Sequence, residues 1–133
     1  MRLAAMRPNP VLVLLAGLAV TGAGCGKGTD ECLALPCPLP LAVEVSVTSA
    51  GGGPVEGVTV RVSGAVTGNA ACNAGPTATA CYVPGVAGTY NLEIMASGFQ
   101  SALRTATASG TTPDCGCPTV ERVHLDVALS RNP

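Results

Sequence analysis

Apolar and polar residues alternate in several short segments that follow residue 40. The alternation is clearest in Leu41–Thr48, Val58–Ser63, Thr89–Met95 and Glu121–Leu129, and weaker in Thr77–Val83 and Gln100–Ala108. A period of two with many β-branched residues is typical of strands that are buried on one face. No apolar stripe with helical spacing persists for three turns. The pattern therefore predicts an all-β domain of six or seven short antiparallel strands packed as a sandwich.

The same alternation predicts which side chains face the core. In the first segment the odd positions are aliphatic, so we expect Leu41 to point inward and Ala42 to point outward. The other inward positions expected are Val43, Val45, Val47, Val58, Val60, Val62, Tyr90, Leu92, Ile94, Val123, Leu125, Val127 and Leu129.

Glycine and proline mark the connections between these segments. The run Gly51–Gly57 supplies positive-φ positions and a proline-fixed turn, so the first two strands are expected to form a hairpin. Ser63–Pro76 and Gly110–Pro118 lack a regular apolar period and are predicted to be long loops. Long loops on a rigid sandwich often carry specificity.

The amino-terminal segment has the layout of a processing signal. Arg2 and Arg7 precede the apolar run Val11–Val20, and small residues follow it. Ten helical residues span about 15 Å, half of the roughly 30 Å of a bilayer core, so the run is too short for a conventional membrane span. A charged segment followed by a short apolar one is typical of a secretory signal. We therefore expect residues 1–24 to be a signal peptide.

The residues that end this segment, Gly22-Ala23-Gly24-Cys25, resemble the bacterial lipobox, although Gly22 stands where an aliphatic residue is usual. The resemblance implies that Cys25 is diacylated and becomes the amino terminus of a lipoprotein anchored in the cell envelope, most simply in the outer membrane. Residues 25–38 would then form a flexible tether, and residues 39–131 the sandwich. The alternative is cleavage after Ala23, which would release a soluble secreted domain.

Three further motifs resemble those of carboxypeptidase regulatory-like domains. They are the turn and strand Gly53–Val60, the strand Val86–Leu92 and the turn Ala96–Gln100. The resemblance spans Leu41 to Leu129 and implies a transthyretin-like (Ig-like) Greek-key sandwich of seven strands, without catalytic residues. Such domains are accessory modules of peptidases, adhesins and envelope proteins. The cysteines of this chain depart from the family pattern.

Cysteine count favours disulfide bonds in an oxidising compartment. The chain has seven cysteines, and setting aside Cys25 leaves an even number. The six expected to form disulfides are Cys32, Cys37, Cys72, Cys81, Cys115 and Cys117. One glycine separates the last two, so they should take different partners. If the first and last strands are parallel neighbours, as the resemblance implies, Cys32 and Cys37 pair with Cys115 and Cys117 in either combination, leaving Cys72 for Cys81.

Charge and composition argue against several functions. Seven basic residues in 133, with a net charge of −1, leave no basic surface for nucleic acid. The only histidine, His124, lies between Arg122 and Asp126 on the outward face of a strand, which is typical of a solvated charge ladder rather than a catalytic site. A zinc site using Cys115, Cys117 and His124 is a weaker alternative. We expect no enzyme activity, cofactor or metal.

The expected function is therefore a non-catalytic, membrane-anchored binding or structural module, with an envelope protein or a glycan as its ligand. Glycan-binding sandwiches usually stack sugars on exposed aromatic rings. The chain has only Tyr82, Tyr90 and Phe99, and Tyr82 alone is expected to be exposed. A carbohydrate-binding module that uses Tyr82 is thus the alternative activity.

Overall fold

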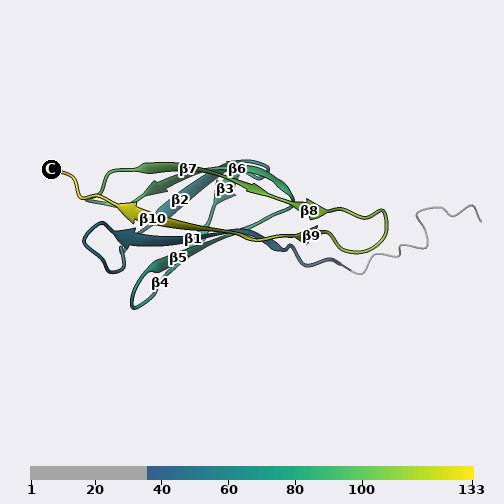
Figure 1. The fold of residues 1–133 in the computed structure, drawn as a ribbon, viewed down its shortest axis with the longest axis horizontal. Helices are drawn as coiled ribbons and strands as arrows, with labels where there is room; N and C mark the ends of the chain where they lie inside the picture. The colour runs from purple at the N-terminus through teal and green to yellow at the C-terminus, as the bar shows by residue number, and fades with distance from the viewer. Residues whose placement is uncertain (1–35) are drawn as a thin grey trace, which may run out of the picture.

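The computed structural model describes residues 36–133, and the regular secondary structure in this range is entirely β-strand (Figure 1). The prediction of an all-β domain is confirmed. The strands are β1 (Leu41–Ser49), β2 (Thr59–Gly64), β3 (Gly68–Asn69), β4 (Ala71–Ala74), β5 (Thr79–Pro84), β6 (Gly88–Met95), β7 (Ala102–Ala108), β8 (Gly110–Thr111), β9 (Thr119–Val120) and β10 (Val123–Leu129).

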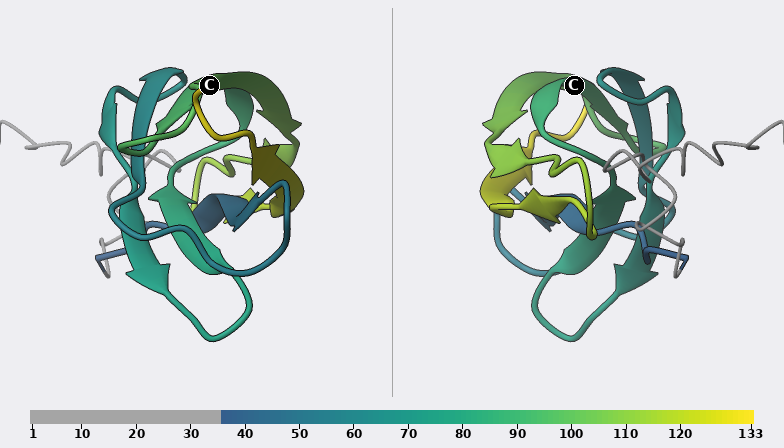
Figure 2. Two further views of the ribbon diagram at one scale, coloured as in Figure 1. Left: turned by 90° about the vertical axis from the view of Figure 1, so that its left-hand side faces the viewer. Right: turned by 90° about the vertical axis from the view of Figure 1, so that its right-hand side faces the viewer.

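Two four-stranded sheets enclose one hydrophobic core (Figure 2). The first sheet has the order β10-β1-β5-β4 and the second has the order β3-β2-β6-β7. The short strands β8 and β9 pair with each other and extend from one end of the sandwich, opposite the C-terminus (Figure 1). Strands β1 and β10 are parallel, from the pair Val43 and Val123 to the pair Ser49 and Leu129, as the family resemblance implied.

Most side chains predicted to face inward do so. Buried members of the predicted set are Val43, Val45, Val47, Val60, Val62, Tyr90, Leu92, Ile94, Val127 and Leu129. Ala42 was predicted to face outward but is fully buried. The pairing of β1 with β5 shifts register between Leu41 and Val43, so this irregularity breaks the strict alternation on which the prediction rested.

The expected hairpin between the first two strands is not formed. Strand β1 has β10 on one side and β5 on the other, so neither of its edges is free for β2. The connection instead crosses to the second sheet, where β2 pairs with β6. This connection covers the core at the end where β1 finishes and β5 begins. There Val55 is buried and its carbonyl accepts a hydrogen bond from the Thr79 hydroxyl.

The segment Ser63–Pro76 is not one long loop, as the sequence had suggested. It contains β3, which pairs with β2, and β4, which pairs with β5 in the other sheet. The chain therefore passes between the sheets near Ala70. These strands have two and four residues, too few for an alternation to be recognised.

Tyr90 is the largest fully buried side chain among residues 36–133. Its hydroxyl donates a hydrogen bond to the carbonyl of Val86, in the turn that precedes β6. Burial raises the pKa of the Tyr90 phenol above its ordinary value of 10.0. The Tyr90 hydroxyl can donate this hydrogen bond to the Val86 carbonyl only while it is protonated.

Candidate functional site

Two disulfides among the predicted pairings are present. Cys37 is bonded to Cys117, with 5.3 Å between their Cα atoms, and Cys72 is bonded to Cys81. Cys115 is also disulfide-bonded, whereas Cys32 and the predicted lipidation site Cys25 lie outside the described residues. The alternative zinc site is wrong, because the sulfurs of Cys115 and Cys117 are already in disulfides.

The two disulfides have different surroundings. Cys72 and Cys81 are directly opposite each other on β4 and β5, and Cys81 is fully buried in the core. The Cys37–Cys117 bond instead joins the segment before β1 to the loop between β8 and β9, at the end of the sandwich where β1 begins (Figure 1). This second bond fixes the carboxyl-terminal end of the predicted tether, residues 25–38, to the folded domain. Disulfides fit an oxidising, extracytoplasmic environment.

The outer face of the first sheet carries the charged side chains that the sequence singled out. Arg122 forms an ion pair with Glu44 of β1 at 3.1 Å, and His124 pairs with Asp126 at 3.2 Å. These groups are exposed or half-buried. The Arg122–Glu44 pair links the start of β10 to β1, whereas the His124–Asp126 pair lies within β10, so the expected charge ladder crosses between strands only at Arg122 and Glu44. Both pairs make only weak, solvent-screened contributions to stability. Tyr82 lies on the same face opposite Glu44 and is half-buried rather than freely exposed.

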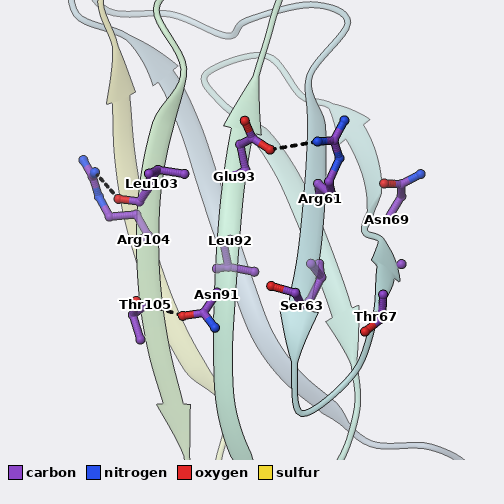
Figure 3. A pocket seen from close by; sticks show the side chains of 12 residues that line it. Arg61, Ser63, Thr67, Asn69, Asn91, Leu92, Glu93, Leu103, Arg104 and Thr105 are labelled. Carbon is purple, nitrogen blue, oxygen red and sulfur yellow. Dashed lines mark hydrogen bonds and ion pairs between the residues drawn. The ribbon is translucent and has the colours of Figure 1, made fainter.

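The outer face of the second sheet forms a groove of about 600 Å³ that the sequence did not identify (Figure 3). Its walls and floor come from β2, β6 and β7, and from β3 with the turn before it. Most of the lining residues have polar side chains, although apolar atoms make up the larger part of the exposed lining surface. The lining residues are Arg61, Val62, Ser63, Thr67, Gly68, Asn69, Asn91, Leu92, Glu93, Leu103, Arg104 and Thr105.

Strand register brings the groove's side chains together in rows. Arg61 is opposite Glu93, which is opposite Leu103, and Ser63 is in line with Asn91 and Thr105 in the next row. Successive side chains of a strand alternate between faces, so outward residues two positions apart form neighbouring rows on the same surface. These rows together form a largely polar surface across the adjacent strands β2, β6 and β7.

An ion pair and a hydrogen bond order the floor of the groove. Arg61 Nη1 lies 3.1 Å from Glu93 Oε2, and their side chains are 66% and 35% exposed. The Thr105 hydroxyl donates to Asn91 Oδ1 at 3.3 Å, and Figure 3 shows the Asn91 amide nitrogen turned away from Thr105 toward β2. Leu103, 72% exposed, is the prominent apolar side chain on the β7 side.

The alternation along β2 and β6 did identify Arg61 as outward-facing, but it gave no reason to group it with Glu93 or Thr105. Arg61 and Glu93 are 32 residues apart in the chain, and the pairing of β2 with β6 alone makes them neighbours. The available sequence signal was the run of polar residues at outward positions, which is also what any solvated strand face would show.

Comparison with known proteins does not assign a function to the groove. No helix among residues 36–133 is long and apolar enough to cross a membrane. No protein-family model matches the chain, and no curated protein matches it.

Proposed function

We propose that this chain is an exported, envelope-anchored lipoprotein whose β-sandwich is a non-catalytic binding module. The observation that carries the proposal is the pair of disulfides, Cys37–Cys117 and Cys72–Cys81, because such bonds persist in oxidising compartments outside the cytoplasm. The charged and apolar layout of residues 1–24 and the small residues before Cys25 agree with export and lipid attachment.

We also propose that the domain is a Greek-key sandwich of the transthyretin-like type and related to carboxypeptidase regulatory-like domains. Two observations support this. Strands β1 and β10 are parallel neighbours, and seven of the ten strands in residues 36–133 have four or more residues. The proposed relationship is also supported by three sequence motifs that resemble those of the family, Gly53–Val60, Val86–Leu92 and Ala96–Gln100.

The chemistry of the candidate nucleophiles and bases supports a role without catalysis. His124, the only histidine, pairs with Asp126 on an open strand surface, where water screens the interaction. The five cysteines from Cys37 to Cys117 are all in disulfides, so they offer no thiolate. A general base held beside a nucleophile in a closed site would be needed for acyl transfer.

Intact mass spectrometry of the chain purified from its membrane fraction tests the proposal. We expect a polypeptide that begins at Cys25 and carries the mass of a diacylglyceryl group. The Cys25→Ser variant should be exported without lipid and should leave the membrane fraction. A product that begins at Gly24 and carries no lipid would support the soluble secreted alternative and refute the anchor.

A further inference from the structure

We propose that the groove on the outer face of the β3-β2-β6-β7 sheet binds a short, uncharged oligosaccharide through hydrogen bonds rather than through aromatic stacking. The inference deepens the proposed function, since it takes the domain to be a binding module. It assigns the ligand to a surface on the opposite side of the sandwich from Tyr82, the residue that the sequence had suggested for glycan binding.

The dimensions of the groove suit a small ligand. Its volume of about 600 Å³ lies within the range of roughly 300–1,000 Å³ that small-molecule sites occupy. The rigid strands β2, β6 and β7 supply most of the lining, so the polar groups are held in place before a ligand arrives.

The polar groups of the groove match the chemistry of sugar hydroxyls. A hydroxyl both donates and accepts hydrogen bonds, so a polyol needs donors and acceptors interspersed at close spacing. The groove offers the Asn91 amide nitrogen and the Arg61 guanidinium as donors, Glu93 as an acceptor, and the Ser63 and Thr67 hydroxyls as either (Figure 3). A peptide with apolar anchors would instead need apolar pockets, and Leu103 is the only strongly exposed large apolar side chain among the lining residues.

The charge of the groove matches an uncharged ligand. Glu93 forms an ion pair with Arg61, so these two side chains together add no net charge to the groove. Arg104 is at the rim, and its guanidinium donates to the carbonyl of Leu103 on the side turned away from β6 (Figure 3). A phosphate or a polyanionic chain would meet the Glu93 carboxylate without a cluster of cations to offset it.

A glycan array of short neutral and acidic oligosaccharides, probed with the full exported chain in detergent, gives the first test. We expect binding to one or more neutral oligosaccharides. The strongest of these is then titrated by calorimetry against the Asn91→Ala variant, which should bind about tenfold more weakly, the loss of roughly one hydrogen bond. The matched control is Asn73→Ala, which removes an exposed asparagine from β4 in the other sheet and should leave the affinity unchanged.

A second pair of variants removes one charge from each of two similar ion pairs. Glu93→Gln breaks the pair in the groove, and Glu44→Gln breaks the 3.1 Å pair with Arg122 on the other face. Only Glu93→Gln should weaken neutral-glycan binding. Three results would overturn the proposal. The first is no binding on the array, and the second is binding to acidic glycans only. The third is that wild type, Asn91→Ala and Glu93→Gln bind the neutral glycan with equal affinity. None of these results bears on the mass of the amino terminus, which tests the anchor separately.

Discussion

The Cys72–Cys81 disulfide gives a quantitative prediction about stability. It spans nine residues and links directly opposite positions of β4 and β5. In the chain-entropy description, closing a loop of this length removes about 2.6 kcal/mol of conformational free energy from the unfolded state. Cys81 is fully buried, so replacing it with alanine also removes packing in the core, roughly the 0.8 kcal/mol of one buried methylene. The double variant Cys72→Ala/Cys81→Ala should therefore lose about 3.4 kcal/mol.

Urea denaturation monitored by circular dichroism measures this loss as a change in the free energy of unfolding. A second variant, Cys72→Ala/Cys81→Val, separates the two contributions. Valine suits a strand and fills the space that both sulfurs leave, so this variant should recover the packing and lose only about 2.6 kcal/mol. A loss below about 1 kcal/mol in both variants would refute the loop-closure reasoning, and equal losses in the two would refute the packing argument.

Two further substitutions test the contribution of the buried Tyr90 side chain and of the two-stranded β8–β9 sheet to stability. Tyr90→Phe should cost about 0.5–1.5 kcal/mol at neutral pH, measured by urea denaturation, because the part-buried hydrogen bond to the Val86 carbonyl is lost. Since the pKa of Tyr90 is raised, wild type should lose part of its stability as pH rises above about 10, whereas Tyr90→Phe should lose less; equal alkaline losses would contradict this. Gly110→Ala should lower the melting temperature, because its Cβ would collide with the Thr119 carbonyl oxygen, whereas Gly51→Ala, whose Cβ meets nothing within 4 Å, should not.

Local sequence information determined where most strands lie and which side chains enter the core. Each of these properties depends on neighbours one or two residues away, as with Tyr90, Leu92 and Ile94, so alternation is enough to predict it. The cysteine pairing was also largely predictable, because Cys72 and Cys81 are close in the chain, and because the family resemblance placed the starts of the first and last strands together.

The tertiary structure decided which strands are neighbours, and with them the candidate site. Alternation in β1 and β2 is the same whether they form a hairpin or lie in different sheets, because strand pairing depends on contacts across the whole domain. The irregular register that buries Ala42 and the short strands β3 and β4 left no recognisable pattern. Arg61 and Glu93 face the same groove only because β2 pairs with β6, a long-range choice that no local pattern records.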